Sequence, residues 1–197
     1  MLKGQNYNHA KEGSHIWVEP IKLLTDIELI KELLSNNPRN LLLFILGINT
    51  NLNTKELLSI KALQVRNLNP GESIQIVNTR NGKIRKVPLN KICIKSIENL
   101  FKNIYYNDND SIFMGYRGLL TIPSVTRMVK SWCNKINLTG NYGSQSLRKT
   151  WGYHQYVTYN VDIRTIMKYL HFANIRQTRN YLGIEPKPVR SLFENEI

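Results

Sequence analysis

The middle of the chain carries the strongest constraint on its fold, two strand-like segments joined by a tight-turn sequence. Residues 73–77 alternate between polar and apolar side chains, which is typical of a strand with one buried face, and residues 84–89 are expected to form the return strand. Asn81-Gly82 stands between them, and both residue types adopt the positive φ angles that a two-residue hairpin turn requires. We therefore expect one antiparallel hairpin, with the rest of the fold built around it.

The segments around this hairpin have the patterns of helices. Thr25 and Glu28 form a capping-box pattern, which predicts a helix that runs to about residue 35. Residues 39–47 are mostly apolar but fall well short of the ~18 residues that span a membrane, so we expect a buried helix there. Further helices are expected over residues 54–61, 91–103, 123–135, 144–158, 162–170 and 174–181. The predicted fold class is mainly α with one small antiparallel hairpin, that is, α+β.

Composition and chain-breaking residues predict a single domain with a tail at each end. The chain has 197 residues, of which 42% are hydrophobic, and this is enough for one buried core. Residues 1–21 are polar and mixed, so a tail or linker is expected there. Pro186 and Pro188 favour a second tail over residues 185–197. The expected domain therefore spans residues 22–184.

The charge of the chain predicts a polyanionic partner. Lys and Arg number 27 against 14 Asp and Glu, which gives a net charge of +13, and the isoelectric point is about 9.8. Values this high favour nucleic acid as the partner. A basic protein without such a partner is the alternative, because net charge governs association and not fold.

The cysteines point away from both a metal site and a disulfide framework. Cys93 and Cys133 stand far apart, and the chain has no Cys-x-x-Cys, no His-Glu-x-x-His and no secretory leader pattern. Both thiols are expected to be small buried apolar groups. We expect a reduced cytoplasmic protein that has no metal, no other cofactor and no membrane segment.

Two blocks in the second half of the chain carry the chemical information. Residues 145–154 read Gln-Ser-Leu-Arg-Lys-Thr-Trp-Gly-Tyr-His, and residues 178–184 read Thr-Arg-Asn-Tyr-Leu-Gly-Ile. Together with Lys-Val-Pro-Leu at residues 86–89, they resemble the motifs of the tyrosine recombinases, the phage integrase family. The order of the expected elements is also similar to the catalytic domain of that family, from about residue 22 to residue 184.

The resemblance implies cleavage and rejoining of DNA strands without a metal. In that family a tyrosine hydroxyl attacks a backbone phosphate and forms a 3′-phosphotyrosine, while two arginines hold the non-bridging oxygens. A lysine on the hairpin protonates the leaving oxygen. Matched residue by residue, the motifs imply that Tyr181 is the nucleophile and Arg148 the second arginine. Taken alone, Tyr181 could instead close a helix ahead of Gly183, and Arg148 could be a solvated residue.

The remaining positions of that active site have changed in this chain. Asn53 replaces the first arginine, and a neutral amide cannot form a bidentate clamp on phosphate. Arg80 replaces the hairpin lysine, and its pKa is too high for a useful general acid. Gln145 replaces a histidine, and its amide donates hydrogen bonds but exchanges no protons. Phe172 replaces a histidine or tryptophan, and its ring does neither. We therefore predict that cleavage is absent or vestigial. The residues that could have taken over a lost role are Lys83, His171 and Lys55.

DNA binding needs less chemistry than cleavage and should survive these changes. Basic side chains on the hairpin, on a helix and at a helix N-terminus can reach backbone phosphates. Some of them are expected to be ordinary solvated residues instead. The candidate DNA-binding residues are Arg80, Lys83, Arg85, Lys86, Arg127, Lys130, Arg148 and Lys149.

Three functions compete on this evidence. The first is an accessory or regulatory DNA-binding protein of the recombinase type that does not cut DNA. The second is an active site-specific recombinase that forms a phosphotyrosine through Tyr181. The third is a protein-interaction module that has kept only the fold. The chain is either a fragment or a solo domain, and residues 189–197 could dock on a second copy or fold back on their own core.

Overall fold

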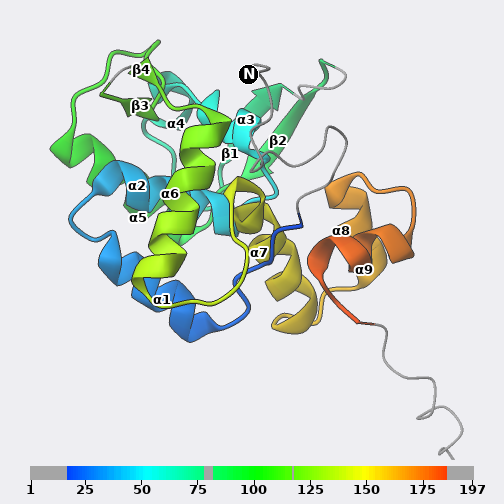
Figure 1. Ribbon diagram of the computed structural model, residues 1–197. Coiled ribbons are helices and arrows are strands. Elements are labelled where there is room, and N and C mark those ends of the chain that lie inside the picture. Colours follow the sequence, from blue (N-terminus) through cyan, green and yellow to red (C-terminus); the bar gives the residue numbers. More distant parts are fainter. Residues whose placement is uncertain (1–16, 78–81, 117, 186–197) are drawn as a thin grey trace, which may run out of the picture.

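The computed structural model describes residues 17–77, 82–116 and 118–185 (Figure 1). Within these ranges the protein is mainly helical, with two small antiparallel sheets. The predicted fold class is therefore confirmed. The helices are α1 (Leu24–Leu33), α2 (Pro38–Asn49), α3 (Thr54–Leu58), α4 (Ala62–Val65), α5 (Lys91–Asn103), α6 (Ile122–Lys135), α7 (Ser144–Val157), α8 (Ile163–Leu170) and α9 (Ile175–Leu182). The strands are β1 (Ser73–Val77), β2 (Ile84–Pro88), β3 (Met114–Gly115) and β4 (Gly118–Leu119).

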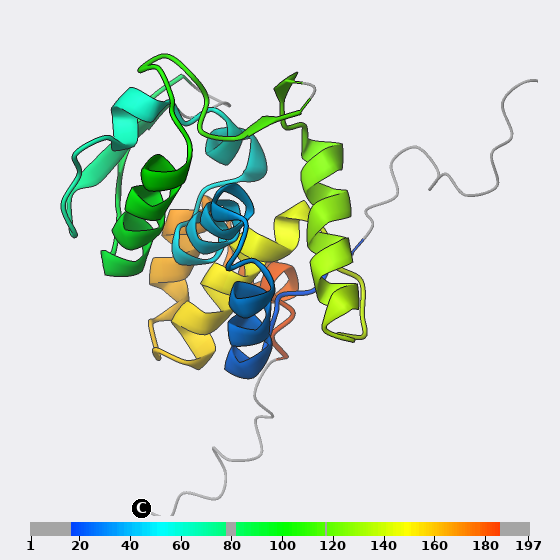
Figure 2. The same ribbon diagram turned by 90° about the vertical axis from the view of Figure 1, so that its left-hand side faces the viewer.

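Helix α2 is the centre of the main hydrophobic core. Its start is fixed by the side chain of Asn37, which accepts a hydrogen bond from the backbone N–H of Asn40, and by Pro38 in the first turn. Its apolar residues 42–46 are all buried. The helix packs against α5 on one side and α7 on another (Figure 1, Figure 2). The apolar run in the sequence is thus a buried helix, as predicted.

A glycine lets α7 approach α2 closely. A Cβ atom at Gly47 would lie 2.7 Å from Cδ1 and 2.8 Å from Cβ of Leu147. Contacts this short do not occur between real side chains, so only glycine allows this spacing. Leu147 immediately precedes Arg148, and the close packing therefore fixes the position of that arginine relative to the core.

The predicted hairpin is formed by β1 and β2, with Ile74 opposite Val87 and Ile76 opposite Arg85. Residues directly opposite in an antiparallel pair share a face. Ile74, Ile76 and Val87 are buried, so Arg85 lies on the inner face of the hairpin and Lys86 on the outer face. The predicted turn residue Asn81 lies outside the described residues, while Gly82 has a φ of 69°.

The structure differs from the sequence expectations in three short features. Helix α1 begins at Leu24, and no side chain caps it, so the predicted capping box of Thr25 and Glu28 is wrong. The one-turn helix α4 and the two-residue strands β3 and β4 were not expected. Elements this short contain only about one period of a hydrophobic pattern, so no repeat appears in the sequence to reveal them.

The segment from Trp17 to Ile21, which the sequence assigned to the first tail, packs along α7. The backbone N–H of Ile21 donates to Oγ1 of Thr150 at 2.8 Å, and Ile21 is fully buried. Its carbonyl oxygen lies 3.0 Å from Nε2 of His154. His154 therefore has a structural role in holding this segment.

Helices α8 and α9 form a second, smaller hydrophobic cluster at one end of the molecule (Figure 1). They pack mainly on each other and on α7. Gly152 of α7 makes this contact close, because a Cβ atom there would lie 2.6 Å from Cδ2 of Leu182. Helix α9 ends at Gly183, whose φ of 65° is a left-handed conformation that glycine adopts without strain. Across the described ranges, none of the helices is long and apolar enough to cross a membrane.

Candidate active site

A pocket of about 500 Å³ lies where the main core meets the small cluster of α8 and α9. Five of the six positions that the recombinase resemblance singles out line this pocket. The sixth, Arg80, lies outside the described residues. The residues that line the pocket are Asn53, Thr54, Lys55, Glu56, Arg85, Ile122, Ser144, Gln145, Arg148, Leu170, His171, Phe172 and Tyr181.

Arg148 is held in the pocket by backbone carbonyl groups. Its Nε donates to the carbonyl oxygen of Asn51 at 2.7 Å, and its Nη2 makes a longer contact of 3.5 Å with the carbonyl oxygen of Leu170. Burial lowers the pKa of Arg148, while the charges of Tyr181 and Glu56 oppose that shift. Arginine nevertheless stays protonated at physiological pH. A partly buried guanidinium with neutral partners and spare N–H donors is well suited to hold an anion.

Tyr181 faces this guanidinium from the last turn of α9. Burial raises the pKa of the Tyr181 hydroxyl, and Arg148 opposes the shift through its charge and through a hydrogen bond between the two side chains. The phenol is therefore protonated at neutral pH, so a nucleophilic attack by Tyr181 requires a group that accepts its proton. On its other side the ring packs against Phe172, with ring centroids 4.8 Å apart.

Asn53 has a structural role at the start of α3. Its Oδ1 accepts a hydrogen bond from the N–H of Glu56 at 3.0 Å, and its own N–H donates to Oε2 of Glu56 at 2.9 Å. This reciprocal pair is a capping box, which satisfies two backbone donors at the helix start. The acceptor atom of Asn53 is thus used by the helix, and the residue contributes no charge to the pocket.

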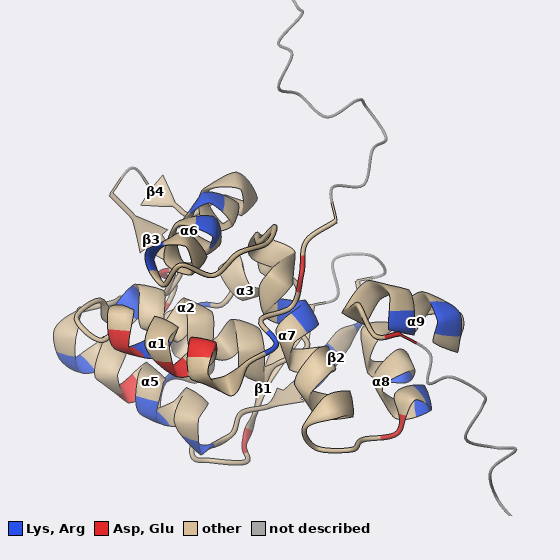
Figure 3. Ribbon diagram, turned by 60° about the horizontal axis from the view of Figure 1, so that its bottom comes forward, with Lys and Arg blue, Asp and Glu red and all other residues tan. Residues whose placement is uncertain are grey.

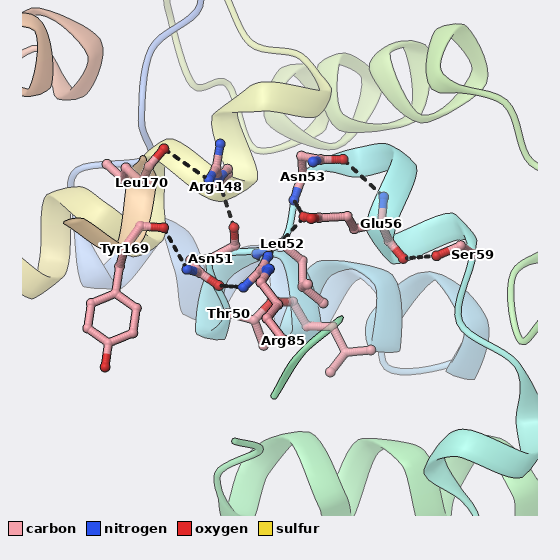
Figure 4. A network of polar contacts seen from close by, with 11 residues as sticks. Thr50, Asn51, Leu52, Asn53, Glu56, Ser59, Arg85, Arg148, Tyr169 and Leu170 are labelled. Atoms are coloured by element: carbon pink, nitrogen blue, oxygen red, sulfur yellow. Dashed lines mark hydrogen bonds and ion pairs between the residues drawn. The ribbon is translucent and has the colours of Figure 1, made fainter. Parts of the chain in front are cut away.

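Arg85 reaches the pocket from β2 and joins a polar network (Figure 4). Its Nη1 donates to Oδ1 of Asn51 at 2.7 Å, and its Nη2 lies 3.0 Å from Oε2 of Glu56. Asn51 in turn donates through Nδ2 to the carbonyl oxygen of Tyr169 at 2.9 Å. Since the backbone carbonyl of Asn51 accepts from Arg148, this one residue links the two arginines.

Arg85 was expected among the DNA-binding residues of the hairpin, and the structure adds that it lies on the inner face, unlike Lys86. A signal for its inward position was present in the sequence. Arg85 has the same alternation phase as the apolar Val87, and opposite phase to Lys86. Read strictly, that alternation places the guanidinium on the buried face.

Four further residues complete or border the pocket. Gln145 lies exposed at its rim, and Phe172 adds an apolar wall beside Tyr181. His171, which ends α8 in a left-handed conformation with φ of 59°, also lines the pocket. Lys55 of α3 is exposed and also lines the pocket. Of the residues considered as replacements, Lys55 and His171 therefore lie at the site, whereas the exposed Lys83 is not among the lining residues.

The prediction that Lys149 binds DNA phosphates is wrong. Its side chain is buried, with only 3% of the residue exposed. Nζ donates to the carbonyl oxygen of Val18 at 2.8 Å and lies 3.3 Å from the ring centroid of Trp17. Burial lowers the pKa of Lys149 to about 8, with the charge of Glu19 opposing the shift. The N-terminal segment covers this residue and removes it from any DNA surface.

Other basic residues remain on the surface. Arg127 and Lys130 are exposed on α6, and Lys86 is exposed on the outer face of β2. Figure 3 shows that Lys and Arg also gather on α8 and α9. The exposed cations there are Arg164, Lys168 and Arg176, and no sequence motif marks them. In the part of the chain that the structure describes, no group of three or more His, Cys, Asp or Glu side chains could hold a metal ion.

Comparison with known proteins places this chain and its fold in one family. The sequence profile of the phage integrase family matches residues 24–187. The probable integrase/recombinase YoeC of Bacillus subtilis is 28% identical over 185 residues, which is 90% of this chain and 96% of YoeC. The tyrosine recombinase XerC of Caldanaerobacter subterraneus is 27% identical, but the chain covers only 43% of it.

Solved structures agree with the sequence matches. The XerH site-specific recombinase bound to its difH substrate superposes with a TM-score of 0.68 over 92% of this chain and 55% of XerH, at 22% sequence identity. The chain thus spans nearly all of YoeC and about half of the longer recombinases. On the fold, the pocket and the match over residues 24–187, the chain belongs to the phage integrase family and has the catalytic-domain fold of the tyrosine recombinases, which take part in DNA recombination.

Proposed function

We propose that this protein binds duplex DNA in a recombination system, in an accessory or regulatory role, and that it cleaves DNA slowly or not at all. The observation that carries the proposal is the composition of the pocket. Arg148 and Tyr181 line the pocket together, whereas Asn53, Gln145 and Phe172 occupy the other described positions. The pocket can therefore hold an anion better than it can transfer protons.

The size of the expected losses favours binding over cleavage. Removal of one preorganised donor from such a site costs on the order of 10² to 10³ in rate. Phe172 has no hydrogen-bonding group, and the Gln145 amide does not titrate in the physiological range. Effects of this kind are not additive. Even so, two independent losses would make cleavage too slow to be useful.

The surface supports a duplex partner. Arg127 and Lys130 on α6 and Lys83 and Lys86 on the hairpin are exposed and can reach phosphates. The similar protein XerH has been solved in complex with its DNA substrate. A cytoplasmic location, where such DNA is available, is part of the proposal. The proposed self-association through the C-terminal tail falls on residues 186–197, which lie outside the described residues.

A second function is favoured by one specific observation, the Tyr181 hydroxyl beside Arg148. In this alternative the protein is an active recombinase. The Tyr181 oxygen attacks phosphorus and forms a new P–O bond, while the bond from phosphorus to the 5′ oxygen breaks. The 5′ oxygen leaves as a hydroxyl after it takes up a proton, and the tyrosine proton passes to a base. The product is a 3′-phosphotyrosine.

One pair of measurements tests these functions. A duplex is first selected from a random pool by its binding to the protein, and its affinity is then measured over a range of salt concentrations. Binding that weakens steeply with salt is expected, and an absence of binding at low salt would refute the proposal. A nicked version of the same duplex then tests cleavage. A covalent adduct that forms with the wild type but not with Tyr181→Phe would establish the alternative.

A further inference from the structure

We propose that Arg85 provides the second guanidinium of the phosphate site, in place of the arginine that is absent at residue 53. The inference rests on the proposed binding of a DNA phosphate at Arg148. A phosphodiester has two non-bridging oxygens, and two guanidinium groups can hold them from different sides. Asn53 cannot be the second of these groups, because it is neutral and its acceptor caps α3.

The first argument is position. Arg85 and Arg148 line the same pocket, although they come from β2 and α7. Asn51 holds both of them, Arg148 through its backbone carbonyl and Arg85 through its side chain. A single residue therefore sets the spacing of the two guanidinium groups, as Figure 4 shows. Tyr181 lies in the same pocket, so an anion bound between the arginines would also meet the hydroxyl.

The second argument is the number of donors that Arg85 has left. A guanidinium has five N–H groups, and Arg85 uses one for Asn51 and one for Glu56. Its Nε is buried and has no hydrogen-bond partner in the structure. The two contacts fix the plane of the guanidinium, because only 19% of the side chain is exposed. A guanidinium that is already oriented loses little freedom when it binds an anion.

The third argument is charge. Glu56 is the only carboxylate among the described residues that line the pocket, and its side chain is buried against Arg85. One carboxylate cannot neutralise two partly buried guanidinium groups. The positive charge of Arg85 also disfavours the charged form of Arg148. A phosphodiester carries one negative charge, which would compensate for the excess in this pocket.

Arg85 could instead serve only as the partner of Glu56, and the experiment must separate these roles. Arg85→Gln removes the proposed phosphate contact, and Arg148→Gln is the reference for a residue of the site. Lys95→Gln is the control, since it removes an exposed cation from α5, which contributes no residue to the pocket. The double variant Glu56→Gln/Arg85→Gln removes both charges of the ion pair while Gln still completes the capping box.

Affinity for the duplex selected with the wild type is the first readout. Loss of a charged hydrogen bond to phosphate corresponds to about a 10-fold to 100-fold weaker affinity. We expect this loss for Arg85→Gln and for Arg148→Gln, and a change below about threefold for Lys95→Gln, as for an exposed charge remote from the phosphate site. The double variant should stay as weak as Arg85→Gln. Thermal melting of each variant shows whether it is folded.

The second readout links Arg85 to one phosphate. In a series of duplexes, one phosphate at a time is replaced by a neutral methylphosphonate. The replacement that weakens binding of the wild type, but not of Arg148→Gln, marks the phosphate that Arg148 contacts. Arg85→Gln should be insensitive at that same phosphate, as expected for two groups in contact. Full sensitivity in Arg85→Gln would overturn the inference. So would an affinity of Arg85→Gln equal to that of Lys95→Gln, or recovery of wild-type affinity in the double variant.

These outcomes separate the inference from the proposed function. If the wild type binds duplex DNA and Arg148→Gln weakens it while Arg85→Gln does not, the inference alone is wrong. If the wild type binds no duplex at low salt, the proposed function is wrong and the inference is overturned with it.

Discussion

The two hydrophobic clusters of this protein differ in size and in the part of the site that each one holds. The main cluster draws buried residues from α1 to α7 and from the hairpin, and it positions Arg148, Arg85 and Asn53. The small cluster has few fully buried residues, and it positions Tyr181 and Phe172. The cationic half of the pocket is thus built on the larger core, whereas the tyrosine is carried by a part of the molecule with much less buried surface.

Several contacts join the two regions, in addition to the packing of α8 and α9 on α7. Asn51 donates to the carbonyl oxygen of Tyr169, Arg148 reaches that of Leu170, and Leu182 packs over Gly152. Segments with little buried apolar surface open locally at a lower free energy than the main core. We therefore expect Tyr181 to move relative to Arg148 without unfolding of the main cluster. The predictions below test this difference, from the largest effect to the smallest.

Phe44→Ala should have the largest effect on stability. Phe44 is fully buried in the main cluster, and its ring packs edge-on against Trp132 with centroids 6.2 Å apart. Truncation of such a residue costs about 3–5 kcal/mol in the free energy of unfolding. Urea denaturation should show this loss for the whole domain, with Leu29→Ala on the exposed side of α1 as control. A loss below about 1 kcal/mol would contradict a main core of this kind.

Leu182→Ala should act on the small cluster alone. Leu182 is fully buried and packs against Gly152, so its removal leaves a cavity between α7 and α9. The free energy for local opening of α8 and α9 should fall by about 2–4 kcal/mol. Hydrogen exchange, measured segment by segment, should show faster exchange there and little change in α2 or α5. Tyr169→Ala, at an exposed side chain of α8, is the control. Equal acceleration in α2 would mean that the two clusters unfold together.

Alkaline pH should destabilise the main cluster through its two thiols. Burial raises the pKa of Cys93 and of Cys133 from the ordinary value of 9.0 to about 12. Between these values an unfolded thiol ionises while the folded one keeps its proton, so the unfolded state binds fewer protons. The free energy of unfolding must then fall as pH rises through this window, by about 1.4 kcal/mol per pH unit for each thiol.

Comparison with the variant Cys93→Ala/Cys133→Ala isolates this effect. Tyr106, Tyr142 and Lys149 also titrate at alkaline pH, but they are common to both proteins and cancel in the difference. Denaturation at a series of pH values above 9 should give a shallower decline for the variant. Parallel curves would show that the thiols are not buried in the folded state.

The elements that were predicted from the sequence are long enough to show a repeating hydrophobic pattern or are marked by a turn sequence. The helix expected over residues 91–103 is α5 (Lys91–Asn103), and the strand expected over residues 73–77 is β1. The expected hairpin and the buried helix at residues 39–47 are also present. The capping box at Thr25 failed because Leu24 already begins α1. A capping pattern shows that two residues can pair, but packing decides where the helix starts.

The site was less predictable because its side chains depend on distant segments. The inward position of Arg85 follows from strand alternation and could have been found. The burial of Lys149 could not, since it depends on Trp17 and Val18, which pack there from far along the chain. The use of Asn53 as a helix cap, by contrast, follows from the local capping-box pattern of Asn53 and Glu56 and could have been found.

Asn53→Ala should have the smallest effect of this series, and it tests whether that residue belongs to the framework or to the chemistry. Loss of a helix N-cap costs about 1 kcal/mol, and the five-residue helix α3 depends on this one. Asn53→Asp should keep the cap, since a carboxylate accepts the same hydrogen bond from the N–H of Glu56 and also favours the helix dipole. It adds a negative charge to the pocket, however, and should weaken binding of the selected duplex. Asn53→Ala would then lower the free energy of unfolding with little loss of DNA affinity. Asn53→Asp would weaken DNA binding with little change in the free energy of unfolding. If Asn53→Ala weakened DNA binding as much as Arg148→Gln does, the Asn53 amide would contact phosphate directly. The assignment of Asn53 as a helix cap only, with Arg85 as the second phosphate ligand, would then be wrong.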